Sequence, residues 1–330
     1  MRDTREMKPF RSQETFLPNG EGWELEVSRS WNPRTLESRR RPVLMVPGFG
    51  NNKSVFSFPD DFHSWESNYV KRGYEVWTVN LRGQGNSKFL GRRNRPIGIR
   101  DLAVTDLNVV FDYIIHNTLT DRKQVDVIGA SLGAAVMYVH AVLNPNNYIG
   151  SMVAVGGPFR WEQCHPVVSL AMSRPRLVGM IPVKGSRTFL KHAFPLLRRF
   201  PIFIKQYIQP DSVAGDNHDG LLPAVDDPCR NLARQLAEWI NAKDLVVDGT
   251  NITQGLKRVT NPLLCATGNN DGIVPPATSL AAIAASGSKI KEVLWIGDDQ
   301  TPFGHTDPMI HRESPERVFE PIAKWLDRQH

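Results

Sequence analysis

Ser131 lies between two glycines in the segment Gly129-Ala130-Ser131-Leu132-Gly133, which matches the pattern G-x-S-x-G. The apolar run "VDVI" precedes the segment, and the helical pattern "AAVMYVHA" follows it. A serine at a turn from strand to helix can act as a nucleophile, because small flanking residues permit the sharp bend and a helix N-terminus favours negative charge. The alternative is an unreactive serine where a helix packs closely on a strand. The context favours the nucleophile.

A serine nucleophile needs a histidine base, and that base needs a carboxylate to orient it. In parallel sheets these groups follow later strands at the carboxyl edge, in the chain order serine, acid, histidine. Asp271 follows the strand-like segment "PLLCATG", and His305 follows "KEVLWIGDDQ". The chain between them is long enough for one helix and one strand. We therefore expect Ser131, Asp271 and His305 to converge as nucleophile, orienting acid and base.

Other carboxylates offer alternatives for the acid. Asp271 precedes a glycine, so it would also suit an ordinary turn. Glu162, soon after the segment "AVGG", is the second candidate, because some sheets of this kind carry the carboxylate there. Asp298, Asp299 and Asp307 are expected to be loop or capping residues.

The remaining histidines and cysteines are not expected to hold a metal. His140 lies on the predicted helix after Ser131, where a buried structural role is expected. His165 adjoins Cys164, but no third ligand follows at a spacing that zinc sites use. Three scattered cysteines are too few for a disulfide framework or a cysteine-based zinc site. The chemistry expected of Ser131 requires neither metal nor cofactor, and we expect none.

The tetrahedral intermediate of acyl transfer needs two N–H donors. Leu132, the residue after the nucleophile, is expected to supply one, and the loop after "PVLMV" the other. Phe49, which follows Pro47 and Gly48, is the obvious residue in that loop. Only its backbone N–H matters for this role, so its side chain could instead shape an acyl pocket.

The formal net charge of +6 is concentrated in one segment. Between Gln163 and Pro210 there are eight lysines and arginines and no aspartate or glutamate. No nucleic-acid motif accompanies this charge, so nucleic-acid binding is not expected. The basic residues alternate with bulky apolar ones. They are either the solvated outside of a lid, or a surface that meets anionic lipid, a coenzyme A thioester or another acidic amphiphile.

The N-terminal segment "MRDTREMKPFRSQETF" lacks the apolar stretch of a secretory signal. No apolar run approaches the roughly 20 residues that span a bilayer. Together with the few cysteines, these features predict a cytoplasmic protein.

Buried strand-like runs alternate with helical patterns on both sides of Ser131, which predicts a mostly parallel sheet with helices on both faces. A long segment rich in proline, arginine and bulky apolar residues interrupts the alternation. We therefore expect an α/β core at 41–157 and 259–330, with a helical cap inserted at 158–258. Residues 1–40 are expected to form an N-terminal extension, with "WELEVSRSW" as an edge strand.

Five segments together resemble the α/β-hydrolase superfamily: "VPGFG", "GYEVWTVNLRGQGNS", "GASLGA", "TGNNDGIVPP" and "FGHTDP", in this order. The resemblance covers residues from about 42 to 329, without the cap. Within the superfamily, the lipase-like and polyhydroxyalkanoate-synthase-like branches are the most similar. It implies the α/β-hydrolase fold, a triad of Ser131, Asp271 and His305, and oxyanion donors at Phe49 and Leu132.

Two positions depart from the superfamily pattern. Pro47-Gly48 occupies the place where many members carry His-Gly, although a backbone donor does not need that histidine. Position 131 is serine, whereas the synthases carry cysteine there, which weakens a polymerase interpretation. Arg82, in the segment "NLRGQGNS", is expected to stabilise a turn and to connect loops.

The expected function is a serine hydrolase that cleaves carboxylic esters of hydrophobic acyl groups through an acyl-enzyme on Ser131. An acyltransferase or thioesterase would use the same acyl-enzyme, and a non-catalytic binding protein could use the same scaffold. Dehalogenase and epoxide-hydrolase chemistry would require aspartate at position 131. The expected partner is a small hydrophobic ester, with contact between the basic cap and an anionic amphiphile or membrane surface left open.

Overall fold

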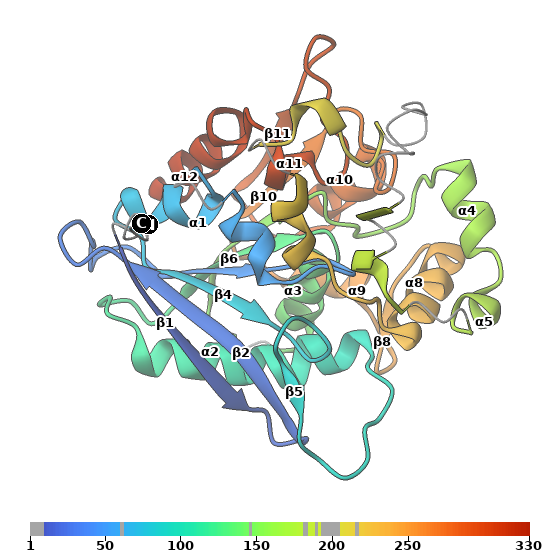
Figure 1. The fold of residues 1–330 in the computed structure, drawn as a ribbon, viewed down its shortest axis with the longest axis horizontal. Coiled ribbons are helices and arrows are strands. Elements are labelled where there is room, and N and C mark those ends of the chain that lie inside the picture. The colour runs from blue at the N-terminus through green and yellow to red at the C-terminus, as the bar shows by residue number, and fades with distance from the viewer. Residues whose placement is uncertain are drawn as a thin grey trace, which may run out of the picture.

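The computed structural model describes residues 10–59, 63–144, 147–180, 184–188, 191–192, 205–214 and 218–330. Its centre is a nine-stranded sheet in the order β1-β2-β4-β3-β6-β7-β10-β11, with β5 paired to β2 (Figure 1). Six neighbouring strands are parallel: β4 Val76–Asn80, β3 Val43–Val46, β6 Val125–Ala130, β7 Ile149–Val155, β10 Leu263–Gly268 and β11 Lys291–Ile296. The mostly parallel sheet predicted from the sequence is confirmed.

Side chains alternate between the two faces of the sheet along each strand, so both faces carry apolar residues. Helices cover both faces. In β3, Leu44 and Val46 point into one core, and Val43 and Met45 point into the other. The helices that contribute to the first core include η2 Asp101–Asp106, α2 Leu107–Asn117, α3 Leu132–Leu143 and α10 Pro276–Ala285. Those of the second core include η1 Lys53–Ser57, α1 Trp65–Lys71, α11 Asp307–Ile310, η6 Pro315–Phe319 and α12 Glu320–Asp327.

The N-terminal part of the chain forms antiparallel strands that extend the sheet: β1 Arg11–Pro18, β2 Trp23–Trp31 and the short β5 Lys88–Phe89. The strand predicted in "WELEVSRSW" is β2. Its predicted place at the edge is wrong, because β2 pairs with both β1 and β4. The edge strand is β1, whose sequence "RSQETFLP" is mostly exposed and so carries no apolar alternation that would reveal it.

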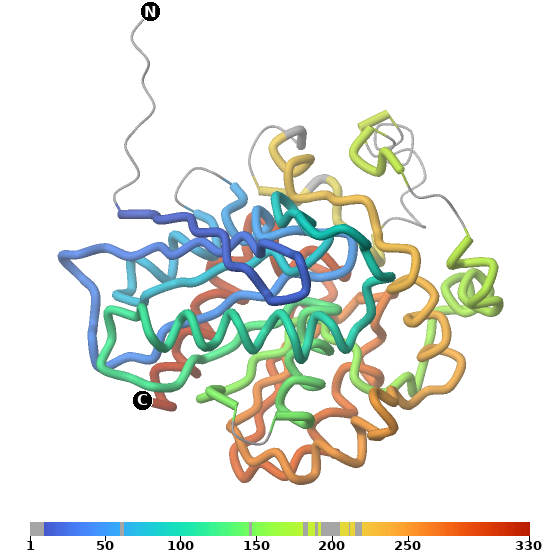
Figure 2. Tube along the Cα trace, turned by 90° about the horizontal axis from the view of Figure 1, so that it is seen from below, coloured from blue at the N-terminus to red at the C-terminus, as the bar shows by residue number. Residues whose placement is uncertain are grey.

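The chain between β7 and β10 contains short elements and one longer helix, α8 Arg230–Ala242. The others are α4 Pro166–Met172, α5 Pro175–Val178, η3 Pro210–Ser212, η4 His218–Ala224, β8 Val246–Val247, β9 Thr250–Asn251, α9 Ile252–Gly255 and η5 Leu256–Arg258. Helices α4 and α5 contact α8 and lie on its outer side (Figure 1). The perpendicular view in Figure 2 shows the light-green segment with α4 and α5 projecting from the right side of the molecule.

The last pieces of the segment 158–258 pack on the sheet domain itself. Helices α9 and η5 contact α3. Gly255 of α9 approaches Val142 of α3 so closely that a Cβ on Gly255 would lie 2.2 Å from Val142 Cγ1. Glycine therefore permits this close contact. Within the described ranges, no helix is both long enough and apolar enough to cross a membrane.

Candidate active site

Ser131 forms the turn between β6 and α3. Its backbone has φ 50° and ψ −119°, a conformation that non-glycine residues rarely adopt. Such backbone strain costs on the order of 1–3 kcal/mol and persists only where the surroundings hold it. Here the N–H of Ser131 donates to the carbonyl oxygen of Val155 at 2.9 Å, which ties the turn to the neighbouring strand β7. The turn therefore presents the serine side chain at the carboxyl edge of the sheet.

The two glycines of the G-x-S-x-G segment are required by close packing at this turn. A Cβ on Gly129 would lie 2.5 Å from the backbone nitrogen of Ala134, and one on Gly133 would lie 2.2 Å from the carbonyl oxygen of Val46. Both gaps are too short for a carbon atom, and backbone atoms cannot move aside as a flexible side chain can. The glycines allow α3 to start directly against β6 and β3.

Three side chains that are far apart in the sequence meet at this edge. His305 Nε2 lies 2.9 Å from Ser131 Oγ, and His305 Nδ1 lies 2.8 Å from Asp271 Oδ2. His305 is only 6% exposed and Asp271 only 5%, so bulk water competes little for these contacts. The structure therefore brings the predicted nucleophile, base and acid together in hydrogen-bonding contact.

The backbone orients Asp271 for this contact. After β10, the second carboxylate oxygen, Oδ1, accepts from the N–H groups of Ile273 at 2.9 Å and Val274 at 2.8 Å. Two backbone donors on one oxygen fix the plane of the carboxylate and leave Oδ2 for the histidine. The turn chemistry that made Asp271 ambiguous in the sequence is thus the chemistry that positions it.

The segment 205–209 holds the loop that carries His305. The N–H of His305 donates to the carbonyl oxygen of Gln206 at 3.1 Å, and the N–H of Thr306 donates to that of Tyr207 at 2.9 Å. The Tyr207 ring also stacks on the imidazole, with centroids 6.3 Å apart. The imidazole therefore depends on a segment that the sequence did not connect with it.

Asp307 connects the same two segments from the buried side. Its carboxylate accepts from the N–H of Gln209 at 2.8 Å and from that of Gly304 at 2.6 Å, and its side chain is fully buried. Burial raises the pKa of the Asp307 carboxyl to about 6. The sequence predicted a loop or capping residue, and the structure shows one that also links the His305 loop to residue 209.

The predicted N–H donors lie next to the serine. A Cβ on Gly48 would be only 3.1 Å from Ser131 Cβ, so the loop after β3 passes directly over the serine. Phe49 is the next residue in this loop. Phe49 and Leu132 both border the cavity at Ser131. The N–H of Leu132 has no acceptor within its own helix, because it belongs to the first turn of α3. Phe49 can serve as donor and shape the cavity at the same time.

A cavity of about 210 Å³ opens at Ser131. Among the described residues, Ser131, His305, Asn51 and Thr306 are the polar side chains of its wall, and Tyr207 and Trp161 add one polar atom each to large rings. The apolar wall comes from the sheet domain and from the segment 158–258, which contributes Pro158, Trp161, Val168, Met172, Tyr207, Leu236 and Ile240. A wall of this kind suits an uncharged apolar group next to the serine.

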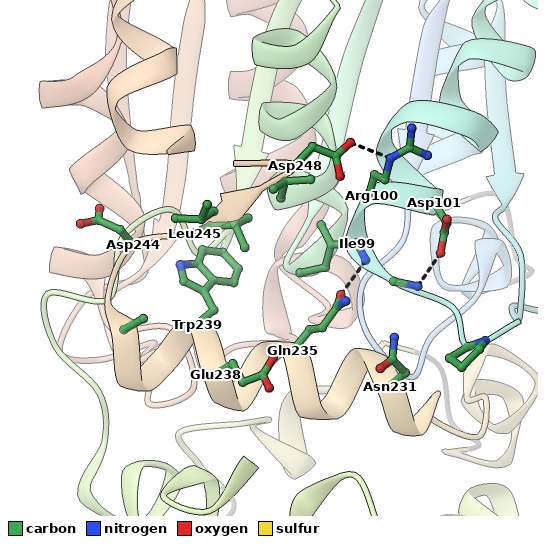
Figure 3. A pocket seen from close by; sticks show the side chains of 15 residues that line it. Ile99, Arg100, Asp101, Asn231, Gln235, Glu238, Trp239, Asp244, Leu245 and Asp248 are labelled. Atoms are coloured by element: carbon green, nitrogen blue, oxygen red, sulfur yellow. Dashed lines mark hydrogen bonds and ion pairs between the residues drawn. The ribbon is translucent and has the colours of Figure 1, made fainter. Parts of the chain in front are cut away.

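A larger cavity of about 470 Å³ lies on the other side of α8, and Figure 3 shows it. It contains none of the three side chains at Ser131. Gln235 on α8 accepts from the N–H of Ile99 at 2.8 Å, and Arg100 is paired with Asp248 at 2.7 Å (Figure 3). These polar side chains therefore bond to neighbouring segments.

The alternative sites considered in the sequence take no part in the cluster at Ser131. Glu162 is paired with Arg160 at the surface. His140 is buried with Nδ1 2.8 Å from the carbonyl oxygen of Ala103, and burial lowers the pKa of its imidazole to about 4. His165 caps α4 by accepting from the N–H of Val167, and among the residues described here no group of three His, Cys, Asp or Glu could hold a metal ion.

Other polar residues have structural roles close to those predicted. Asp298 accepts from the N–H groups of residues 300 and 301 and caps a turn, whereas Asp299 is exposed. Arg82 is buried, and its guanidinium contacts Asp106 at 2.6 Å and Glu21 at 2.7 Å. It thereby connects the loop after β4 to the start of α2 and to the β1–β2 turn.

Residues 43–320 match the sequence profile of the alpha/beta hydrolase family. The chain belongs to this family. A comparison with curated proteins finds no match. Among solved structures, similar folds include a hydrolase from Pseudomonas aeruginosa, at 15% identity and a TM-score of 0.63, covering 95% of this chain and 98% of that one. An esterase from Thermogutta terrifontis has 19% identity and a TM-score of 0.57, with 96% and 99% covered.

A bacterial membrane phospholipase A is also similar, at 14% identity and a TM-score of 0.60, covering 98% of this chain and 87% of that one. At such identities these structures support the α/β-hydrolase fold and nothing finer. The family assignment and the fold that the resemblance implied are confirmed.

Some residues at the site were not predicted from the sequence, and they form hydrogen bonds with backbone groups of its loops. Tyr207 and Gln206 hold the His305 loop, as described above. Gln84, in the loop after β4, donates from Nε2 to the carbonyl oxygen of Gly48 at 3.1 Å. No spacing in the sequence points to these contacts, because each joins segments that meet only in the folded chain.

Proposed function

We propose that the chain is a serine hydrolase that cleaves carboxylic esters of hydrophobic acyl groups through an acyl-enzyme on Ser131. The observation that carries the proposal is the continuous contact from Ser131 Oγ through His305 to Asp271, with distances of 2.9 and 2.8 Å. A buried Asp–His–Ser contact of this kind supplies an activated nucleophile without a cofactor.

The chemical steps follow from these contacts. Ser131 Oγ attacks the ester carbonyl carbon as its proton passes to His305 Nε2, while Asp271 stabilises the charged imidazole. The N–H groups of Phe49 and Leu132 stabilise the oxyanion, and loss of one such donor typically lowers kcat about 10²- to 10³-fold. The alcohol leaves with the proton held by His305. Water then attacks the acyl-enzyme through the same base and releases the acid.

The size and the wall of the cavity suit a small apolar acyl or alcohol group of the substrate. Within the described ranges, no lysine, arginine, aspartate or glutamate borders it, and these residues therefore offer no ionic partner for a charged substrate. Epoxide and haloalkane chemistry would need a carboxylate in place of Ser131. An acyltransferase would share the acyl-enzyme, and added alcohol or thiol would then appear in the product.

A panel of p-nitrophenyl esters of increasing acyl length tests the proposal. We expect wild-type protein to hydrolyse these esters, and Ser131→Ala to lower kcat by about 10⁴-fold or more. Ser169→Ala, which alters an exposed serine on α4, is the matched control and should retain full activity. Equal rates for wild type and Ser131→Ala would overturn the proposal.

A further inference from the structure

The outer side of α4 and α5, with Met180 just after α5, exposes large apolar side chains, and α4 also borders the cavity at Ser131. Leu170 is 76% exposed and Met180 is 70% exposed, and Val167 and Leu177 are more than half exposed. Neither helix buries any residue. Side chains of this size on one short stretch of surface indicate an interaction site rather than scattered exposure.

The same stretch is basic. Arg176 and Met180 border a shallow groove of about 740 Å³ together with Arg95, Arg230 and Arg234. Arg95 and Arg234 are paired with Glu21 and Glu238. Over the described part of the chain, Arg176 and Arg230 form no ion pair, and the groove is lined by no acidic residue. A basic apolar surface is complementary to an anionic amphiphilic one.

The helix α4 connects this surface to the cavity. Val168 and Met172, four residues apart, line the cavity at Ser131, whereas Val167 and Leu170 face outward. A lipid that meets the outer side of α4 is therefore separated from the cavity by this helix. The apolar part of this surface therefore lies on the same helix as part of the cavity wall.

We propose that the outer side of α4 and α5, with Arg230 of α8, docks on membranes that contain anionic lipid. The apolar side chains enter the interface between headgroups and acyl chains, and the arginines contact lipid phosphates. The consequence for the substrate rests on the proposed function: the ester then comes from the membrane. Binding itself does not need an active serine.

Co-sedimentation with vesicles tests the proposal on the full chain. We expect binding to phosphatidylcholine vesicles that contain phosphatidylglycerol, weaker binding at high salt, and little binding to phosphatidylcholine alone. An arginine near an anionic surface contributes about fivefold to partitioning, so Arg176→Gln with Arg230→Gln should reduce binding about 25-fold. Leu170→Ser with Met180→Ser should reduce it by about tenfold.

Matched controls lie elsewhere on the surface. Leu90→Ser removes an apolar side chain that is 65% exposed, and Arg34→Gln with Arg39→Gln removes two exposed charges between β2 and β3. These variants should bind as wild type does. An unchanged circular-dichroism spectrum and thermal unfolding transition show that each variant is folded.

Binding that ignores lipid charge, no binding to either vesicle, or equal binding by all variants would overturn the proposal. Capture of an acidic protein without vesicle binding would also contradict it. If vesicles bind but no ester is hydrolysed, the proposed function fails and the docking surface stands.

A second inference rests on the contact between Gln84 and Gly48. The Gly48 carbonyl belongs to the peptide unit that carries the N–H of Phe49, and a trans peptide directs these two groups to opposite sides. Gln84 Nε2 donates to this carbonyl, while Gln84 Oε1 accepts from the N–H of Leu81 at 3.0 Å. Gln84 does not border the cavity, whereas Gly48 and Phe49 do. The carbonyl is therefore held away from the cavity.

From this geometry we infer that Gln84 is a positioning residue that keeps the N–H of Phe49 directed at the oxyanion. The inference rests on the proposed function. Gln84→Met removes the donor at similar volume, and we expect kcat for p-nitrophenyl acetate to fall about 10²-fold with little change in KM.

Gln84→Glu gives a pH signature that a purely structural role would not. An ionised carboxylate cannot donate to the Gly48 carbonyl, but a protonated one can. The kcat of Gln84→Glu relative to wild type should therefore rise as the pH falls, whereas that of Gln84→Met should stay low at every pH. Gln13→Glu, on the exposed face of β1, is the control and should follow wild type.

Wild-type kcat in Gln84→Met, or a pH-independent deficit in Gln84→Glu, would overturn the inference. An inactive wild-type protein would instead refute the proposed function. The two failures are therefore distinguishable.

Discussion

Helix α8 separates two cavities of different size and chemistry. The smaller one, about 210 Å³, contains Ser131 and His305, and Leu236 and Ile240 of α8 border it. The larger one, about 470 Å³, is bordered by the opposite side of α8, and both charged and apolar side chains line it (Figure 3). In the larger cavity Gln235 and Arg100 bond to neighbouring segments, whereas in the smaller one Ser131 and His305 contact each other on a mostly apolar wall. The contact between these side chains, and not the volume, therefore makes the smaller cavity the proposed site.

The largest expected effect comes from Asp271, the acid that contacts His305 of the smaller cavity. Asp271→Asn keeps the two bonds from the N–H groups of Ile273 and Val274 but no longer stabilises the charged His305 or fixes its tautomer. We expect kcat for p-nitrophenyl esters to fall about 10⁴-fold with the fold intact. Steady-state kinetics with circular dichroism measures both. A loss below tenfold would remove Asp271 from the proposed mechanism.

Asp307 gives a pH-dependent effect near the same cavity. Its pKa of about 6 exceeds the ordinary value of 3.8, so the folded state binds a proton more tightly than the unfolded state does. This contribution to stability is present below about pH 4 and is lost as the pH rises through 6, by about 3 kcal/mol.

Asp307→Asn removes that contribution. The free energy of unfolding of the variant minus that of wild type should therefore rise by about 3 kcal/mol from pH 4 to pH 7. Urea unfolding at the two pH values measures the difference. A constant offset between the two proteins would contradict the assigned pKa.

A substitution on α8 compares the two cavities directly. Ile240→Ala enlarges the smaller cavity, and we expect kcat/KM for longer acyl esters to rise relative to short ones by about tenfold. Glu238→Ala alters the larger cavity from the same helix and should leave the ratio unchanged. If Glu238→Ala changed the acyl preference and Ile240→Ala did not, the acyl group would bind in the larger cavity, which would contradict the account.

The smallest effect is expected at the rim of the larger cavity. Arg100 and Asp248 form an ion pair whose side chains are about half exposed, and such pairs contribute less than about 1 kcal/mol. Arg100→Ala should change the free energy of unfolding by no more than this and leave ester hydrolysis unchanged. A tenfold loss of kcat/KM in this variant would show that the larger cavity takes part in substrate binding.

The sequence predicted those features that depend on local order along the chain. Ser131, Asp271 and His305 follow the parallel strands β6, β10 and β11, and parallel strands bring such positions to one edge. Contacts between distant segments could not be predicted from the sequence. Gln84 contacts Gly48 only when two loops fold together, and Asp307 connects residues 209 and 304. The strand β1 was missed because its exposed residues show no apolar periodicity.

The basic segment between Gln163 and Pro210 was predicted as part of a cap, and much of it lies outside the described residues, including Arg198 and Arg199. The exposed apolar residues of α4 and α5 could not be predicted, because helical spacing alone does not say which neighbour covers a face. The boundaries of the core and cap remain predictions.

Covalent labelling with a fluorophosphonate probe tests the central claim most directly. The account predicts a single adduct on the peptide that contains Ser131, formed by folded wild-type protein and absent in Ser131→Ala. Folded wild-type protein that stays unlabelled, or labelling that persists in Ser131→Ala, would contradict it.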